Sequence, residues 1–191
     1  MSDLIGQSIG RYHITEQLGQ GGMATVYKAF DTNLDTEVAI KFIRREKLTP
    51  EFADKALKRF KIEAKKTAQL SHPNIVNVMD YGEHEGQPYL VMKYIRGGTL
   101  KQKLGKPVHW AEAAKLLAPI AHALEYAHQQ KMLHRDVKPA NILMTESGQP
   151  VISDFGVAKV LETSEETSTL TGTGVGVGTP EYMAPEQWMG K

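Results

Sequence analysis

Cysteine is absent from the 191-residue chain, which excludes disulfides and thiolate metal sites. An excess of charge of one sign is also absent, because 23 Lys and Arg residues offset 22 Asp and Glu residues to give a net charge of +1. Nucleic-acid binding needs a marked basic excess, so no nucleic-acid partner is expected. No apolar run is long enough to span a bilayer, and residues 1–6 lack the charged and apolar regions of a signal peptide. We therefore expect a cytoplasmic chain without a membrane segment, and leave open an anchor beyond residue 191 of a longer parent chain.

The first half of the chain reads as a small antiparallel sheet with one helix. Its expected strands are short stretches rich in β-branched and aromatic residues, separated by turns at 19–22 and 31–35. These strands are 12–18, 24–30, 37–43, 75–81 and 88–94. Between the third and fourth strands, Thr49 and Pro50 form a helix start, and the apolar spacing predicts a helix to about Leu70.

The second half changes to a helical period after Gly97 and Gly98. A helix is expected over 110–130, kinked at Pro119 because an interior proline costs roughly 3 kcal/mol. Its expected apolar face carries Ala113, Leu117, Ile120, Leu124 and Ala127. Short strands are expected at 142–144 and 151–153. Residues 161–177, rich in Ser, Thr, Glu and Gly, predict a mobile loop.

Five chemical signals follow one another along this framework. They are a glycine cluster at 19–22, the strand Val38-Ala39-Ile40-Lys41, the helical Glu63, the stretch His134 to Asn141, and Asp154-Phe155-Gly156. Each has an ordinary alternative: a tight turn, a solvated lysine, an exposed helix residue, a turn or cap residue, a plain loop. Backbone without Cβ approaches phosphates closely, and hard oxygen ligands such as those of Asn141 and Asp154 suit Mg²⁺. The ordered series favours phosphoryl transfer over five separate coincidences.

This series resembles the protein kinase family, in its bacterial-type serine/threonine branch, from about Tyr12 to the end of the chain. The resemblance implies an α+β, protein-kinase-like two-lobe fold: a small antiparallel β-sheet lobe with one helix, and an incomplete, mainly helical lobe. The expected divisions are a flank at 1–11, the first lobe at 12–92 and a partial second lobe at 93–191. Within them lie a hinge at 92–98, a catalytic loop at 134–141 and an activation segment at 154–186.

The resemblance assigns catalytic roles residue by residue. Asp136 would be the base that accepts the substrate proton, and Lys138 would neutralise charge on the moving phosphate. Glu63 would hold Lys41 at the α- and β-phosphates. Asn141 and Asp154 would bind Mg²⁺, with Mn²⁺ as an alternative metal. His134 and Phe155 would be structural, stacking within the fold rather than reacting.

The resemblance also implies an ATP site. Its expected residues are Leu18, Gly19, Gln20, Gly21, Gly22, Val26, Ala39, Lys41, Met92, Lys93 and Ile95. Val26 would pack on the adenine ring, and the main chain of Lys93 and Ile95 would pair with it. The chain departs from the family pattern in two places. Ala24 replaces the third glycine, and Lys93 stands where an acid is often found.

Regulation is expected in the activation segment. Arg135, beside the base, is a candidate partner for a phosphorylated residue. Thr171 and Thr173 are the expected autophosphorylation sites; the ordinary alternative is an unmodified polar loop. Thr179 is expected to position Asp136 and Lys138 rather than to be a phosphosite.

The expected activity is that of a non-specific serine/threonine protein kinase acting on protein substrates, with a dimer through the first lobe in the intact protein. The chain ends five residues beyond Glu186, so it reads as a fragment whose second half is marginally stable, and its activity alone is left open. A pseudokinase or nucleotide-binding interaction module is the main alternative. A small-molecule kinase ranks below it, because such enzymes generally lack the Ala184-Pro185-Glu186 segment and the Lys138 pattern.

Overall fold

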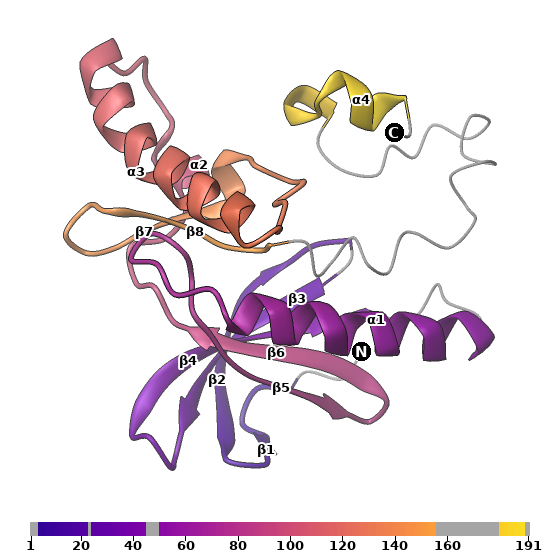
Figure 1. Cartoon of the computed structure of the whole chain (residues 1–191). Helices are drawn as coiled ribbons and strands as arrows, with labels where there is room; N and C mark the ends of the chain where they lie inside the picture. The colour runs from indigo at the N-terminus through magenta and orange to yellow at the C-terminus, as the bar shows by residue number, and fades with distance from the viewer. Residues whose placement is uncertain (1–3, 23, 45–49, 156–179, 190–191) are drawn as a thin grey trace. The chain divides into compact units, whose positions relative to one another are not determined.

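The computed structural model describes residues 4–22, 24–44, 50–155 and 180–189 (Figure 1). The chain divides into two compact units, unit 1 with residues 1–71 and 76–95, and unit 2 with residues 72–75 and 96–191. No helix among the described residues is both long enough and apolar enough to cross a membrane. The mixed α+β architecture expected from the sequence, with an antiparallel sheet and one helix in the first half, is confirmed.

Unit 1 is built on a six-stranded antiparallel sheet in the order β1-β2-β3-β4-β6-β5. The strands are β1 (Ser8–Ile9), β2 (Tyr12–Gln20), β3 (Ala24–Asp31), β4 (Thr36–Ile43), β5 (Val78–His84) and β6 (Gln87–Lys93). The helix α1 (Pro50–Ala68) packs against β5 and β6 (Figure 1). It buries Phe60, Ala64 and Thr67 at helical spacing, so its polar face is left to solvent.

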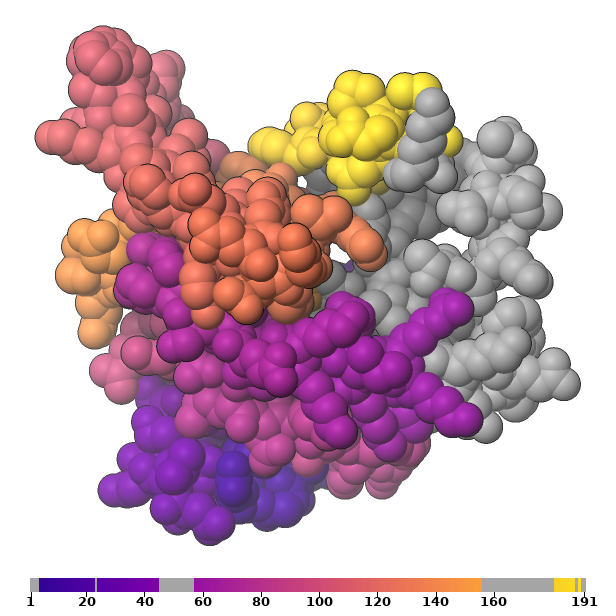
Figure 2. Space-filling view, viewed as in Figure 1, coloured from indigo at the N-terminus to yellow at the C-terminus, as the bar shows by residue number. Residues whose placement is uncertain are grey.

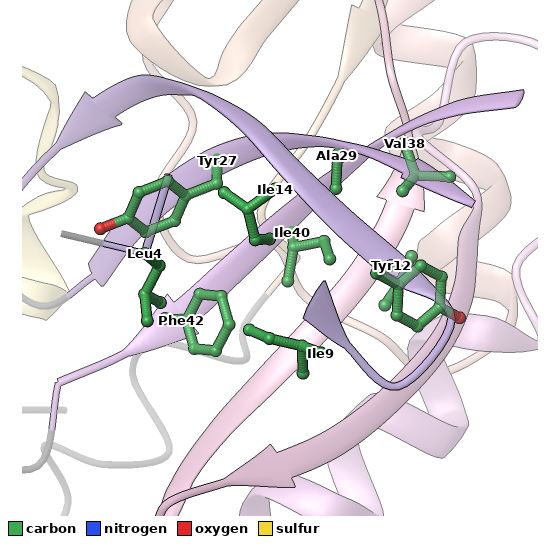
Figure 3. Packing of buried hydrophobic residues seen from close by; sticks show 10 residues of the cluster. Leu4, Ile9, Tyr12, Ile14, Tyr27, Ala29, Val38, Ile40 and Phe42 are labelled. Carbon is green, nitrogen blue, oxygen red and sulfur yellow. The ribbon is translucent and has the colours of Figure 1, made fainter. Parts of the chain in front are cut away.

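One face of this sheet carries the hydrophobic core of unit 1. Alternate residues of β3 and β4 point to this face, because side chains of a strand alternate between the two sides. Tyr27 contacts Phe42 edge to face, with ring centroids 5.9 Å apart. Figure 3 shows these side chains converging with others from β1, β2 and β6. The cluster is Leu4, Ile9, Tyr12, Ile14, Tyr27, Ala29, Val38, Ile40, Phe42 and Val91.

A charged cluster ties the ends of β2, β3 and β5 together. The Tyr12 hydroxyl donates to Asp80 Oδ2 at 2.8 Å, and Arg11 Nη2 lies 3.3 Å from the same oxygen. Arg11 Nε lies 3.1 Å from Oδ2 of the fully buried Asp31, an ion pair without hydrogen-bond geometry. Burial, reinforced by the hydrogen bond to Asp80, raises the pKa of Tyr12 above its ordinary value.

Unit 2 contains short elements and one long helix. They are α2 (Leu100–Lys103), α3 (Trp110–Gln129), η1 (Pro139–Asn141), β7 (Ile142–Met144), β8 (Pro150–Ile152), η4 (Pro180–Tyr182) and α4 (Pro185–Trp188). β7 and β8 form a two-stranded antiparallel sheet, and α3 packs against β8. Gly98 and Thr99 join α2 to β7, because Met144 N–H donates to the Gly98 carbonyl at 2.8 Å and Thr99 bridges Leu143.

The expected apolar face of α3 is only partly correct. Ile120 and Ala127 are buried as expected, together with Ala123. Leu117, on the same expected face, is 49% exposed, because the first turns of α3 project from the rest of unit 2 (Figure 2). The helix contains Pro119 and continues without a break to Gln129, so the proline does not end it.

The expected strand at 75–81 begins three residues late. β5 starts at Val78, and Ile75 instead forms an isolated parallel bridge with Ile152 of unit 2. The cause is Asn74, whose side-chain amide donates to the Pro150 carbonyl at 2.7 Å while its own carbonyl accepts from Ile152 N–H at 2.8 Å. These hydrogen bonds bind residues 72–75 to β8 rather than to the sheet of unit 1.

The other boundaries shift by small amounts. The first strand extends two residues into the expected glycine turn and ends at Gln20, with register shifts between Ile14 and Glu16 and between Gln17 and Gly19. The strand expected at 151–153 lies at 150–152, because Ser153 turns its N–H to the Asn141 carbonyl. The elements that the sequence did not predict are two to four residues long; they are β1, α2, η1, η4 and α4.

Candidate active site

The second face of the unit 1 sheet gathers several of the expected nucleotide contacts. Gly19 pairs with Val26, and Val26 pairs with Lys41. Residues directly opposite each other on neighbouring strands share a face, so these three lie together. Ala39, two residues before Lys41, shares this face and pairs with Met92 of β6. The register therefore brings one small glycine, two small or branched apolar side chains and an ammonium to one side of the sheet.

The glycine-rich turn is exposed, and a backbone hydrogen bond joins its two ends. Gly21 N–H donates to the Ala24 carbonyl at 2.8 Å. Gly21 and Gly22 are both exposed, and a Cβ at Gly22 would meet no atom within 4 Å. Leu18 and Gln20 are also exposed at the end of β2. Ala24, which stands in place of the third glycine, is buried as the first residue of β3, so its methyl is accommodated.

Lys41 and Glu63 lie in the same unit. Lys41 is 8% exposed, a degree of burial that is rare for a lysine unless it is paired. The Glu63 carboxylate forms an ion pair with Lys66, whose Nζ lies 2.7 Å from Oε1. Thr67 also donates to the Glu63 carbonyl at 2.9 Å, which fixes this turn of α1. The Lys41–Glu63 pairing stays a prediction.

The expected hinge, residues 92–98, begins with the last two residues of β6. Met92 is buried, Lys93 is exposed and Ile95 is half-buried. Lys93 N–H donates to the Asn77 carbonyl at 3.0 Å, so the contact expected for Lys93 uses its carbonyl. The carbonyl oxygen belongs to the main chain, so a lysine side chain at position 93 in place of an acid does not remove this expected contact.

The stretch 134–141 in unit 2 brings two polar side chains together around the carboxylate of Asp136. Lys138 Nζ lies 2.9 Å from Asp136 Oδ2, and Asn141 Nδ2 donates to the same oxygen at 2.9 Å. Asn141 Nδ2 also donates to the Asp136 carbonyl at 2.8 Å. Asp136 itself is half-exposed, so its carboxylate is held in place and still open to solvent.

His134 supports this loop from behind rather than facing the carboxylate. It is 2% exposed, and its ring lies 4.7 Å from that of the equally buried Phe155. Its Nε2 lies 2.7 Å from the Ser153 carbonyl, and its Nδ1 accepts from Asp136 N–H at 3.2 Å. Because a carbonyl can only accept, the proton is on Nε2 and Nδ1 is the acceptor. These contacts agree with a structural role for both rings.

Two residues of the motifs adopt left-handed backbone conformations. Arg135 has φ of +65° and Asp154 has φ of +68°, a region that costs non-glycine residues of order 1–3 kcal/mol each. The hydrogen bonds of the neighbouring residues His134 and Ser153 offset this free-energy cost by holding the backbone on either side in place. Backbone strain of this kind concentrates at functional sites.

The sequence did not single out two residues that complete the loop. Ser153 donates to the Asn141 carbonyl from both its N–H, at 2.8 Å, and its hydroxyl, at 3.1 Å. Gln187 of α4 donates from Nε2 to the Arg135 carbonyl at 2.8 Å. The only available signal for Ser153 was a polar residue that ends a buried strand directly before Asp154. Nothing in the local pattern marked Gln187.

The donor set fits a metal that arrives with phosphates. Among the residues that the structure describes, no group of three or more His, Cys, Asp or Glu side chains could hold a metal by itself. Mg²⁺ usually takes one or two protein ligands and completes its shell with phosphates and water. The side-chain Nδ2 of Asn141 donates to Asp136, so the side-chain oxygen Oδ1 is the atom that would bind a metal. Thr171, Thr173 and Thr179 lie outside the described residues.

Residues 12–190 match the protein kinase domain. The chain belongs to the protein kinase family. Its relatives include the serine/threonine-protein kinase PrkC of Bacillus subtilis, 41% identical over 190 residues, and PknA of Mycobacterium tuberculosis, 40% identical over 199 residues. The alignments cover 98% and 100% of this chain, respectively. The expected resemblance to bacterial serine/threonine kinases is therefore confirmed.

Solved kinase structures give the same result for the fold. The apo form of PpkA-294 matches with a TM-score of 0.81 and 29% identity, over 100% of this chain and 72% of that one. A kinase domain of Mycobacterium tuberculosis PknI matches with a TM-score of 0.71 and 32% identity, over 82% and 64%. This kinase chain spans 28% of the length of PrkC and 44% of that of PknA.

Proposed function

We propose that this chain carries the catalytic machinery of a protein kinase that transfers the γ-phosphoryl group of ATP to serine or threonine hydroxyls of proteins. The observation that carries the proposal is the arrangement of Lys138 and Asn141 around Asp136 Oδ2, both at 2.9 Å. A carboxylate held by an ammonium and an amide, yet open to solvent, is suited to orient a hydroxyl and accept its proton. This chemistry uses ATP, so we propose a cytoplasmic site of action.

In the proposed reaction, the acceptor oxygen forms a bond to the γ-phosphorus as the bond to the β-phosphate oxygen breaks, and ADP leaves. Asp136 takes the hydroxyl proton late in the transfer. Lys138 offsets negative charge on the moving group, and Lys41 holds the α- and β-phosphates. Asn141 and Asp154 would hold Mg²⁺, which supplies charge neutralisation at the phosphates. Because Lys138 pairs with Asp136, its ammonium is already within reach of the reacting centre.

Autophosphorylation at Thr171 or Thr173, with Arg135 as the partner of the phosphate, is part of the proposal. The support is local: Arg135 follows the buried His134, precedes Asp136 and has its carbonyl fixed by Gln187. A dimer through unit 1 in the intact protein is also proposed. Sedimentation at increasing concentrations tests the dimer, and phosphopeptide mapping tests the threonines.

A pseudokinase that binds nucleotide without transfer is the second candidate. The observation behind it is the ion pair of Glu63 with Lys66, because an active kinase needs the Glu63 carboxylate to hold Lys41. Incubation of the chain with Mg·ATP and a generic phosphoacceptor protein separates the two. Phosphate on serine or threonine of the acceptor supports the kinase, and binding of Mg·ATP without any transfer supports the pseudokinase. Transfer to small alcohols but not to proteins would instead indicate a small-molecule kinase.

A further inference from the structure

The first part of the long segment of unit 2, directly after residue 95, carries basic side chains and no acidic ones. Residues 96–111 contain four basic residues, Arg96, Lys101, Lys103 and Lys106, and no Asp or Glu. The three lysines are exposed. Within the described part of the chain, none of these three lysines pairs with a carboxylate. The chain as a whole has a net charge of only +1, so this is a local concentration of charge.

This basic stretch is fixed next to the catalytic loop. The helix α2, which carries Lys101 and Lys103, packs against η1, the turn that begins directly after Lys138. Its N-terminus is capped by Thr99, whose hydroxyl accepts from Gln102 N–H, and Leu100 is buried beneath it. Gly97 lies so close to Met144 that a Cβ would collide with the Met144 carbonyl. The lysines therefore extend from a rigidly anchored element.

A substrate peptide would pass within reach of these lysines. The acceptor hydroxyl of the peptide must lie at Asp136. Asp136 is five residues before Asn141, the last residue of η1, against which α2 packs. Four residues of extended chain span about 13 Å, and a lysine side chain adds its own flexible reach. A peptide engaged at Asp136 therefore places residues a few positions from the acceptor beside α2.

We infer that Lys101, Lys103 and Lys106 select protein substrates that carry acidic residues within about four positions of the acceptor hydroxyl. This inference rests on the proposed function, because it names the substrate class of the same site. The chain's own threonine-rich run contains acceptors of this class: Thr163, Thr167 and Thr169 lie within four residues of a glutamate, whereas Thr171 and Thr173 do not. A nucleic acid fits less well, since the chain lacks the overall basic excess that such a partner requires.

The test compares three fluorescent peptides with one serine and identical apolar residues: one with four flanking glutamates, one with glutamines and one with lysines. Binding is measured by polarisation in low salt without nucleotide, and transfer is measured separately with Mg·ATP. An exposed ion pair changes affinity by a few-fold, so two or three of them give roughly a tenfold preference for the glutamate peptide. The preference should fall as salt rises.

The double variant Lys101→Glu and Lys103→Glu should lose this preference or reverse it toward the lysine peptide. Lys115→Glu, an exposed lysine on α3, is the matched control and should keep it. Circular dichroism checks that all three chains share a fold. Equal binding of the glutamate and glutamine peptides by the unmodified chain would overturn the inference, as would an unchanged preference in the double variant. Preferential binding of the glutamate peptide without any transfer would support the basic surface and overturn the proposed kinase activity.

Discussion

The Asn141 carbonyl and Ser153 are joined by two hydrogen bonds, one from the Ser153 N–H at 2.8 Å and one from its hydroxyl at 3.1 Å. Ser153 directly precedes Asp154, so this contact joins the chain segments of the two expected metal ligands. Ser153 is 7% exposed, and its carbonyl accepts from His134. One small residue thereby fixes the segments of a proposed base and two proposed ligands.

Replacing Ser153 by alanine removes the hydroxyl bond and leaves both backbone bonds. We expect the Mg²⁺ concentration for half-maximal transfer to rise by about tenfold, because groups that hold metal ligands typically matter by ten- to a hundredfold. Steady-state transfer rates in a Mg²⁺ titration at saturating ATP measure this. Ser153→Thr keeps the hydroxyl and should restore much of the response.

Ser147→Ala is the matched control, because Ser147 is an exposed hydroxyl in the turn between β7 and β8 and bonds only Thr145 among the described residues. It should leave the Mg²⁺ titration unchanged. A Ser153→Ala chain that melts at a lower temperature yet shows the same Mg²⁺ dependence would contradict the positioning role and leave Ser153 a purely structural residue.

Gly97 is expected to tolerate no side chain. A Cβ there would collide with the Met144 carbonyl oxygen and lie 2.8 Å from the Thr145 carbonyl oxygen, both rigid backbone atoms. Gly97→Ala should therefore cost about 1–3 kcal/mol and lower the melting temperature by several degrees. Gly105→Ala is the control, because a Cβ at Gly105 meets nothing within 4 Å. Equal melting temperatures for the two variants in thermal denaturation would refute the close approach.

Tyr12 gives a pH dependence with a defined sign. Burial and the hydrogen bond to Asp80 raise its pKa above the ordinary value of about 10, so folding favours the protonated phenol. This contribution to stability is complete below pH 10 and is lost as the pH rises through the folded-state pKa. Urea unfolding of the unmodified chain and of Tyr12→Phe should show a stability difference that is constant from pH 7 to about 9 and moves against the unmodified chain above pH 10. The same difference at pH 8 and pH 11 would rule out this linkage.

Sequence patterns predicted the elements that bury a regular face. The β-branched and aromatic content of residues 24–30 and 37–43 located β3 and β4, and the helical spacing of Phe60 and Thr67, both buried, located α1. The polar contacts of residues 134–141 were also accessible, because Asp136, Lys138 and Asn141 are close in sequence. Local spacing alone nearly determines that they meet.

Long-range hydrogen bonds explain what the sequence did not predict. Ile75 reads as strand by composition, but Asn74 binds it to β8, a contact with residues more than seventy positions away. The role of Ser153 depends on a partner twelve residues earlier, and that of Gln187 on one fifty-two residues earlier. α2 is too short to show a period, although its Thr99–Gln102 capping box was present in the sequence.

The central claim is that Asp136, held by Lys138 and Asn141, serves phosphoryl transfer. Asp136→Asn keeps the size of the side chain and removes the base, so the variant should fold like the unmodified chain. The decisive measurement is the intact mass of both chains after incubation with Mg·ATP. The account predicts that the unmodified chain gains at least one phosphate and that Asp136→Asn gains none. Equal phosphate on both chains would contradict the assignment of Asp136 as the base, and no phosphate on either would contradict transfer by this chain.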